Sequence, residues 1–526
     1  MLRENTSLFE KMKKFFKILL SRRLLLIITL IAAIVFTFVA YELSILPLKY
    51  FIPLIIIVFL ITFLLYRLSR DKNDSHPVKV AVMKLINIIL AIVLIIASWS
   101  LMKGSNFISA ITGGSEEIIE MDVVVLKDSF YDTIDDLKGQ SFGALHGDAV
   151  NINKTETMIE DDIGDITVTN YASNNELIEA LMTEEMSAII VKNVDLKTFD
   201  SIEENFNEKI RIIQKYEIKL PKVTANSAKV TQEPFIVFIS GRDQKGPINT
   251  FSLSDVNMIA TINPTTKQIL LVSIPRDYYV DIQGIDGVMG KDKLTHSAKG
   301  GIDATIQTVE NLMDIKMNYY AKFNFTSFLN VIDALGGIEI DVPKYDVIGR
   351  DDGVFVTRLD KYTIKPGKQT FDSKHALSFV RERYAFVDGD EIRGKNQMLM
   401  LKAIIKKCCS PSLITSMDSV FESLSDSFET NLSASDIKSL INMQISDMAS
   451  WDVQSFRLTG DASQRTLELA TVGNVTSVNP NGVYVTQPDE QSIAKAREYI
   501  QKVMNNEIVK VESETTKQTE TNTTNE

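Results

Sequence analysis

The sequence predicts an α/β protein that follows three membrane-spanning helices, and two patterns carry this prediction. Three uncharged apolar runs of 17 or 18 residues occupy the first hundred positions, at 24–41, 50–66 and 85–102. Runs of this length can cross a bilayer as helices, and three of them are unusual in a soluble fold. Beyond them, short apolar strands alternate with helical segments, which is typical of α/β architecture.

Loop charge predicts the orientation of the three helices. Seven Lys or Arg precede residue 24 and four lie between residues 67 and 79, whereas the loop between the first two runs has only Lys49. Basic loops stay in the cytoplasm. We therefore expect a cytoplasmic amino terminus at 1–23, a membrane region at 24–103, and an extracellular remainder.

Charge and cysteine content exclude some functions for that remainder. Residues 1–103 carry a net charge of +9 and the rest −21, within the total of −12. A segment with this much negative charge cannot neutralise the phosphates of a nucleic acid. Nucleic acid is therefore excluded as its partner. The only cysteines, Cys408 and Cys409, are adjacent, so neither a disulfide framework nor a Cys-x-x-Cys metal site is expected. This pattern favours a bacterial cell-surface protein.

The outer part divides into an accessory domain at 115–220, a second α/β domain at 233–410, and a C-terminal part of the extracellular domain at 411–510. A short linker at 103–114 joins the membrane region to the first of them. The last residues, 511–526, contain almost only polar side chains, so we expect a disordered tail. The accessory domain is predicted to contain strands at 123–126, 142–145 and 188–191 and helices at 133–138 and 174–182.

The second domain begins with the continuous apolar strand 235–239, which is typical of a strand buried on both faces. Further strands are expected at 256–262, 269–274 and 338–342, with a turn at Asn263-Pro264. Helices are expected at 303–313, 327–335, from Asp372 or Ser373 to about 380, and 394–406.

Two carboxylates stand at strand ends of this domain. Asp243 follows the first strand and Asp255 opens the next. Open α/β sheets place ligands at such ends, and two converging carboxylates can hold Mg²⁺ while leaving coordination positions for phosphate oxygens. The alternative is that either residue only caps a turn.

Cationic side chains cluster further along the chain. Arg276 ends a strand, Arg381 and Arg383 follow a helix, and Arg393 and Gln397 are four residues apart on another helix, where they share a face. Each guanidinium group can donate two parallel hydrogen bonds to phosphate oxygens. A set of arginines therefore indicates a pyrophosphate ligand. Lys293 is a further candidate phosphate contact, and His296 is a candidate acid or base. The alternatives are a surface salt bridge for Arg276, a solvated charged face for Arg393 and Gln397, and a structural role for His296.

Residues 235–407 closely resemble the catalytic domain of the LytR-CpsA-Psr (LCP) family, and the three leading helices with an accessory domain resemble its streptococcal CpsA-type branch. The motifs that carry the resemblance are residues 241–243, 254–256, 273–278, 293–297, 335–338, 379–383 and 393–397. The resemblance implies an α/β catalytic domain with a central mixed sheet. One position departs from the family, which usually has Arg where this chain has Leu253, so a cation is missing there.

The resemblance implies a membrane-anchored phosphotransferase of a Gram-positive cell membrane. It would move a capsular or other wall glycopolymer from undecaprenyl-pyrophosphate to peptidoglycan, forming a phosphodiester. Asp243 and Asp255 would bind Mg²⁺ or Mn²⁺. Arg276, Arg381, Arg383, Arg393, Gln397 and Lys293 would bind the pyrophosphate, and Arg276, Arg381, Arg383 and Asp243 would be catalytic.

Its partners would be the lipid-linked glycan, peptidoglycan, the lipid bilayer and capsule-assembly membrane proteins. Two other functions stay open from the sequence. One is a non-enzymatic membrane regulator of polysaccharide synthesis or its transcription, a label that relatives have carried. The other is a lipid-pyrophosphate phosphatase, which would use the same residues with water as the acceptor.

Overall fold

The computed structural model describes residues 21–68, 77–112, 118–145, 149–171, 173–200, 202–220, 223–242, 253–284, 287–387, 389–410, 419–420, 423, 428–465 and 483–511. The chain forms two compact units. The first contains residues 1–110, 409–422 and 433–449, and the second contains 111–408, 423–432 and 450–526. The predicted disordered tail began at 511, but Val511 is described and packs against the core of the second α/β domain. Residues 512–526 and the predicted metal ligand Asp243 lie outside the described residues.

The first unit contains the three predicted apolar helices, α2 (Arg22–Leu43), α3 (Leu48–Leu68) and α4 (Pro77–Ile111), together with α14 (Ala434–Asp447). Each of α2, α3 and α4 is long and apolar enough to cross a membrane, with mean hydropathies of 2.6 to 2.8. They pack through a small core that includes Ala33, Phe36 and Leu94. A buried hydrogen bond of 2.7 Å from Thr29 Oγ1 to Asn87 Oδ1 joins α2 to α4.

The expectation of a linker directly after residue 102 was wrong, because α4 continues to Ile111. Gly104 and Ser105 do not end the helix. Beyond them Phe107, Ile108 and Ile111 are almost fully buried, so packing of this last apolar turn outweighs the weak helix propensity of the glycine.

The accessory domain is a five-stranded sheet with the strand order β3-β2-β4-β1-β5. Its strands are β1 (Ile118–Leu126), β2 (Ser141–Leu145), β3 (Thr167–Tyr171), β4 (Ala188–Lys192) and β5 (Ile210–Lys219). Two separate apolar cores lie on opposite faces of β1, one around Val123 and Phe142 and the other around Val124 and Leu177. Residues on opposite faces alternate along a strand, which is why one strand serves both cores.

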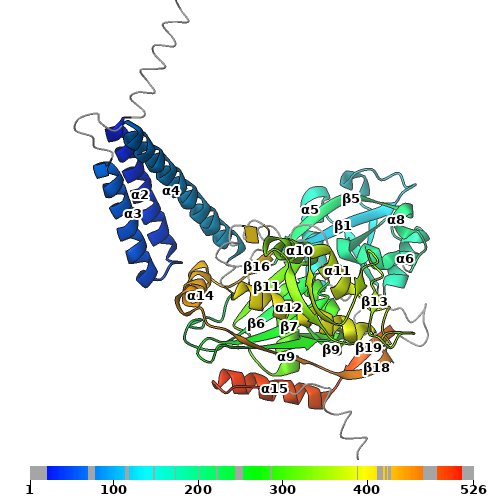
Figure 1. The fold of residues 1–526 in the computed structure, drawn as a ribbon. Coiled ribbons are helices and arrows are strands. Elements are labelled where there is room, and N and C mark those ends of the chain that lie inside the picture. Colours follow the sequence, from blue (N-terminus) through cyan, green and yellow to red (C-terminus); the bar gives the residue numbers. More distant parts are fainter. Residues whose placement is uncertain are drawn as a thin grey trace, which may run out of the picture. The chain divides into compact units, whose positions relative to one another are not determined.

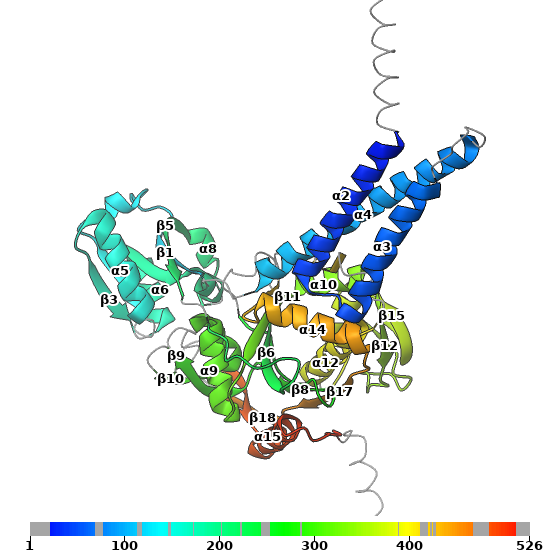
Figure 2. The same cartoon turned by 90° about the vertical axis from the view of Figure 1, so that its left-hand side faces the viewer.

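Helices cover both faces of this small sheet (Figure 2). They are α5 (Ala149–Ile163), α6 (Asn174–Met182), α7 (Leu196–Phe199) and α8 (Phe206–Lys209), with 3-10 turns η1 (Ile134–Leu137) and η3 (Asn193–Asp195). The predicted helix at 174–182 is confirmed, and Ser173 caps it by accepting from Glu176 N. The helix expected at 133–138 is only the short turn η1.

The second α/β domain is built on a mixed six-stranded sheet with the order β16-β11-β6-β7-β8-β17. Its strands are β6 (Phe235–Arg242), β7 (Val256–Asn263), β8 (Gln268–Ile274), β11 (Tyr319–Asn324), β16 (Phe428–Thr430) and β17 (Asp452–Arg457). β6 runs parallel to β11 and antiparallel to β7, while β8 runs antiparallel to β7 and parallel to β17. The prediction of a central mixed sheet is therefore confirmed.

Helices lie on both faces of the six-stranded sheet (Figure 1). On one face, α9 (Gly301–Met313) and α15 (Glu490–Met504) bury apolar side chains against Phe238 and Leu270. On the side away from α15 lie α10 (Phe325–Ala334), α11 (Ser373–Arg381) and α12 (Gly389–Cys408). This arrangement buries β6 on both faces, as its continuous apolar sequence predicted.

Shorter elements surround the sheet. Four two-stranded ribbons are described: β9 (Tyr279–Gly284) with β10 (Gly287–Lys293), β12 (Ile338–Val342) with β15 (Gly367–Phe371), β13 (Phe355–Val356) with β14 (Thr363–Ile364), and β18 (Gly460–Arg465) with β19 (Val483–Pro488). The turn η4 (Leu294–Gly300) follows β10. The segment 411–510 thus supplies both edge strands of the sheet, β16 and β17, as well as β18, β19 and α15.

Candidate active site

A pocket of about 430 Å³ opens where several of the predicted residues meet. The start of β7, the end of β8, the first two turns of α12 and the ribbon β18–β19 form its walls. Asp255, Arg276, Arg393 and Gln397 all line it. Four of the predicted site residues, from segments up to 142 positions apart in the chain, therefore share one cavity.

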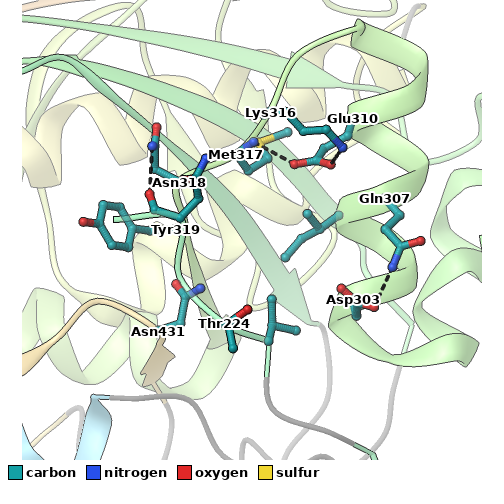
Figure 3. A pocket seen from close by; sticks show the side chains of 12 residues that line it. Thr224, Asp303, Gln307, Glu310, Lys316, Met317, Asn318, Tyr319 and Asn431 are labelled. Atoms are coloured by element: carbon teal, nitrogen blue, oxygen red, sulfur yellow. Dashed lines mark hydrogen bonds and ion pairs between the residues drawn. The ribbon is translucent and has the colours of Figure 1, made fainter. Parts of the chain in front are cut away.

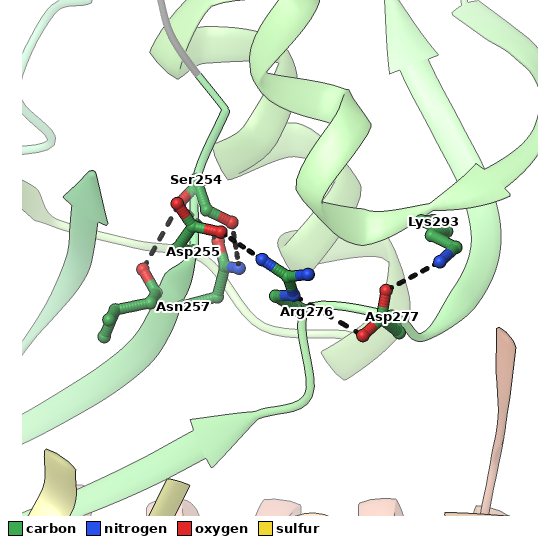
Figure 4. A network of polar contacts seen from close by, with 7 residues as sticks. Ser254, Asp255, Asn257, Arg276, Asp277 and Lys293 are labelled. Atoms are coloured by element: carbon green, nitrogen blue, oxygen red, sulfur yellow. Dashed lines mark hydrogen bonds and ion pairs between the residues drawn. The ribbon is translucent and has the colours of Figure 1, made fainter. Parts of the chain in front are cut away.

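A chain of alternating charges crosses one wall of this pocket (Figure 4). Arg276 Nη1 donates to Asp255 Oδ1, and Arg276 Nε lies 3.5 Å from Asp277 Oδ2. Lys293 Nζ donates to the other oxygen of Asp277 at 2.9 Å. All four side chains are at least half-buried, and this order of charges orients the Arg276 guanidinium along the wall.

The same contacts shift two pKa values. Burial raises the pKa of Asp277, but the charge and hydrogen bond of Lys293, followed by those of Arg276, outweigh burial and hold the pKa below its usual value. For Arg276, burial lowers the pKa, and the carboxylates of Asp277 and Asp255 reverse this effect and raise it. Both groups are therefore charged across the physiological pH range.

Hydrogen bonds behind the pocket fix the turn that presents Asp255. Ser254 Oγ lies 2.8 Å from Ser240 Oγ and donates to Asn257 Oδ1 at 2.9 Å. The Asp255 amide donates to Gly241 O at 2.9 Å. A Cβ on Gly241 would lie 2.9 Å from the Phe323 ring, so glycine permits this close approach of the strands. Leu253 is half-buried and does not belong to the pocket lining described.

The first turns of α12 supply the opposite wall. The helix begins at Gly389, five residues before the predicted start, and a Cβ there would lie 1.9 Å from Arg383 O. Glycine at this position therefore allows α12 to start against the preceding loop. Arg393 and Gln397 both line the pocket, as their spacing of one helical turn predicted.

The structure places Arg381 and Arg383 outside the pocket lining. Helix α11 runs to Arg381, close to the predicted end, and Glu382 is its C-cap. Burial lowers the pKa of Arg381. Arg383 donates to the Tyr384 hydroxyl at 2.7 Å, and its guanidinium lies 4.7 Å from the centre of that ring. The predicted arginine set is therefore divided, with Arg276 and Arg393 in the pocket and Arg381 and Arg383 beyond it.

Comparison with known proteins identifies the family of the domain that contains this pocket. Residues 197–502 match the LytR_cpsA_psr family, and this segment is more than half of the chain. The chain belongs to the LytR-CpsA-Psr family. Residues 80–191 also match a family described as DNA polymerase processivity factor. That match begins within α4, covers well under half of the chain and carries no assignment.

Curated relatives support the same family. Teichoic acid transferase TagT of Bacillus subtilis is 33% identical over 264 residues, which are 50% of this chain and 74% of TagT. TagU of Bacillus licheniformis is 32% identical over 263 residues, 50% of this chain and 75% of TagU. Both are named polyisoprenyl-teichoic acid–peptidoglycan teichoic acid transferases.

Two solved structures align with just over half of this chain. TagT bound to LIIa-WTA aligns with a TM-score of 0.41 and 28% identity, covering 54% of this chain and 97% of that one. Protein gbs0355 of Streptococcus agalactiae aligns with a TM-score of 0.44 and 21% identity, covering 55% and 93%.

The LytR-CpsA-Psr domain has pocket residues that the motif analysis missed. Glu391, Arg457, Thr459, Tyr484 and Thr486 also line the cavity. Most of them come from the C-terminal segment, where no motif was recognised. One signal was present for Arg457, because it ends a short strand and Arg276 lies just beyond the end of another, so the two could share a sheet edge.

His296 does not line the pocket in the described part of the domain. Its Nδ1 lies 2.7 Å from Oδ1 of the fully buried Asp292, four residues earlier. This pair fixes the start of η4 and favours the structural role that the sequence left open.

The donor set is compatible with a magnesium ion beside a phosphate ligand. Among the described residues, no group of three or more His, Cys, Asp or Glu is close enough to hold a metal on its own. Mg²⁺ commonly takes only one or two carboxylates and completes its shell with phosphate oxygens and water. Asp255, which faces the pocket, suits that role, with Asp243 as the second predicted ligand.

Proposed function

We propose that this protein is a membrane-anchored transferase that moves a polyprenyl-linked glycopolymer onto peptidoglycan. The observation that carries the proposal is the convergence of Arg276, Arg393 and Gln397 with Asp255 around one pocket. Family membership and the transferase names of the TagT and TagU relatives support the same reaction class.

The donor in this proposal is an undecaprenyl-pyrophosphate-linked glycan, and the polymer is capsular polysaccharide or another secondary wall polymer. A peptidoglycan hydroxyl oxygen attacks the phosphorus bonded to the glycan. The bond from that phosphorus to the bridging oxygen breaks, undecaprenyl phosphate leaves, and the hydroxyl proton is released. The product is a phosphodiester between glycan and peptidoglycan.

The pocket residues have distinct roles in this reaction. Arg276 and Arg393 bind phosphate oxygens, and Gln397 donates a neutral hydrogen bond. Phosphoryl transfer depends mainly on positioning and on neutralising charge, which this set provides.

Asp255 and Asp243 would hold Mg²⁺, which when bound would neutralise phosphate charge. Lys293 was predicted to contact the phosphate but is not among the lining residues described, and we propose that it acts through Asp277 by holding the carboxylate that orients Arg276. Arg381 and Arg383 are proposed to bind the parts of the donor that extend beyond the pocket.

We propose a multi-pass location in a Gram-positive cell membrane, with the catalytic domain outside. The three apolar helices and the basic loops at their cytoplasmic ends support this orientation. A membrane anchor keeps the active site near a donor whose lipid tail stays in the bilayer. Capsule-assembly membrane proteins are the proposed partners.

The test is product analysis with the full-length protein in lipid nanodiscs. The protein receives a radiolabelled polyprenyl-pyrophosphate-linked glycan, Mg²⁺ and peptidoglycan. We expect label covalently bound to peptidoglycan and free polyprenyl phosphate in equal amounts. Release of free phosphorylated glycan alone would instead indicate a lipid-pyrophosphate phosphatase. An unchanged donor would favour a non-enzymatic regulator.

A further inference from the structure

Arg457 occupies a position in the pocket that resembles that of Arg276. It is the last residue of β17, which runs parallel to β8, and it pairs with Ser273 near the end of β8. The carboxyl ends of parallel neighbours lie at the same edge of a sheet. Both arginines consequently line the same cavity, although 181 residues separate them in the chain.

Helix α12 has a glycine, Gly394, at the point where the Arg457 side chain lies against it. A Cβ on Gly394 would come within 3.3 Å of Arg457 Nε, which is closer than most side-chain contacts. Gly394 directly follows Arg393, a pocket residue on the same helix. The glycine thus lets the Arg457 side chain lie against α12 beside Arg393 and Gln397.

The contacts of Arg457 leave its donors available. Its side chain is 18% exposed, and its one ion pair in the described structure is long, at 3.7 Å from Nη1 to Glu391 Oε2. Lys395 holds the same carboxylate more closely, at 2.7 Å. Burial raises the pKa of Glu391, but Lys395 and then Arg457 outweigh this and keep the pKa low. Glu391 therefore stays charged and is already satisfied by Lys395, while a guanidinium has five N–H donors to offer.

Several cationic side chains lie in or beside the pocket, as an anionic ligand requires. The charged lining residues described, taken with their ion-pair partners, comprise five cations and three carboxylates. The cations are Arg276, Lys293, Arg393, Lys395 and Arg457, and the carboxylates are Asp255, Asp277 and Glu391. Three of the five cations are arginines that line the cavity itself, and loss of Arg457 would remove one of these guanidinium groups.

We propose that Arg457 is a further anion-binding residue of this site, supplied by the C-terminal segment, and that it binds a phosphate group of the donor. The proposal rests on the proposed function. It assigns to β17 the part of the anion-binding wall beside the end of β8.

The test is calorimetric titration of the full-length protein with inorganic pyrophosphate, and then with a soluble short-chain polyprenyl pyrophosphate. Charge-assisted hydrogen bonds in a partly buried site predict that Arg457→Ala weakens binding by about 10-fold to 100-fold. Arg457→Lys should lose less, because it keeps the charge but not the planar fork. Arg465→Ala is the matched control, because Arg465 is an exposed arginine of the adjoining ribbon β18–β19 and lies outside the pocket lining. The Arg465→Ala protein should bind pyrophosphate within about twofold of the wild-type affinity.

A second variant tests the position without removing the charge. Gly394→Ala should displace the Arg457 side chain and weaken pyrophosphate binding, and this loss should vanish in the Arg457→Ala background. Wild-type affinity in a folded Arg457→Ala protein, with binding lost in Arg276→Ala, would overturn this inference and leave the proposed function intact. Absence of pyrophosphate binding by the wild-type protein would overturn both.

Discussion

Two pockets of similar size in the catalytic unit differ in what their polar groups contact. The candidate active site has a volume of about 430 Å³, and a second pocket beside α9 has about 370 Å³. In the second pocket the polar side chains bind one another (Figure 3): Gln307 donates to Asp303 at 2.6 Å, and Lys316 donates to Glu310 at 2.6 Å. Asn318 bonds the backbone of Asn226 and Ile236.

The difference shows that volume alone does not mark a binding site. The charged lining of the second pocket consists of Asp303, Glu310 and Lys316, so its net charge is −1 and its hydrogen bonds are made internally. The candidate active site instead gathers arginines, and guanidinium groups can add a ligand to the contacts they already make. A polar pocket that is satisfied from within stabilises the fold, whereas one with donors available can bind an anion.

Metal removal should give the largest effect. If Asp255 and Asp243 hold Mg²⁺, chelation with EDTA will abolish glycopolymer transfer and added Mg²⁺ will restore it. Asp255→Asn should raise the Mg²⁺ concentration needed for half-maximal transfer, because it removes a negative ligand while keeping the shape. Full transfer in the presence of EDTA would rule out the metal at this pocket.

Substitution of Arg276 should come next. Arg276→Ala removes a partly buried guanidinium and leaves Asp255 and Asp277 facing the pocket without their shared cation. We expect pyrophosphate affinity to fall about 10-fold to 100-fold, with transfer falling at least as much. Titration calorimetry measures the affinity, and circular dichroism confirms that the variant is folded. An affinity equal to wild type would remove Arg276 from the binding site.

A buried carboxylate in the accessory domain tests, through stability, whether the contacts of a polar group offset the effect of its burial. Asp122 is fully buried, and burial raises its pKa to about 6, although Asn193 donates to it at 2.7 Å. Its Oδ1 has no hydrogen-bond partner in the described structure. Asp277, held by Lys293, has a lowered pKa instead. A fully buried carboxylate and a partly buried one in the same chain thus respond to pH in opposite directions.

The sign follows from these shifts. Because the folded-state pKa of Asp122 is raised, its contribution to the free energy of unfolding is present below pH 4 and is lost as the pH rises through about 6. The total loss is at most about 3 kcal/mol. The contribution of Asp277 is present above pH 4 and is lost only as the pH falls further. Hydrogen exchange of β1 amides between pH 4 and 7 measures the first effect, and Asp122→Asn should flatten it. A wild-type profile in that variant would contradict the assignment.

Substitution in the second pocket should have the smallest effect. Lys316 is 79% exposed, so Lys316→Ala removes a surface ion pair worth about 0.2–1 kcal/mol. We expect a small shift in melting temperature and unchanged pyrophosphate affinity. A loss of affinity comparable to that of Arg276→Ala would break the distinction between the two pockets.

Local pattern in the sequence predicted much of this protein. Apolar runs marked α2, α3 and α4, and the apolar strand at 235–239 marked the centre of the sheet. The spacing of Arg393 and Gln397 placed both on one helix face, and strand ends identified Asp255 and Arg276. These features depend on residues near one another in the chain, so periodicity and turn chemistry reveal them.

Tertiary structure decided which of the charged residues meet. Strands β16 and β17 join the sheet from the distant segment 411–510, and this pairing brings Arg457 to the edge where Arg276 lies. The position of Arg381 and Arg383 outside the pocket lining depends on the C-cap at Glu382 and on contacts with Tyr384. The sequence by itself determined the elements and the kind of charge they carry. Pairing between remote strands, which no local pattern encodes, determined the membership of the pocket.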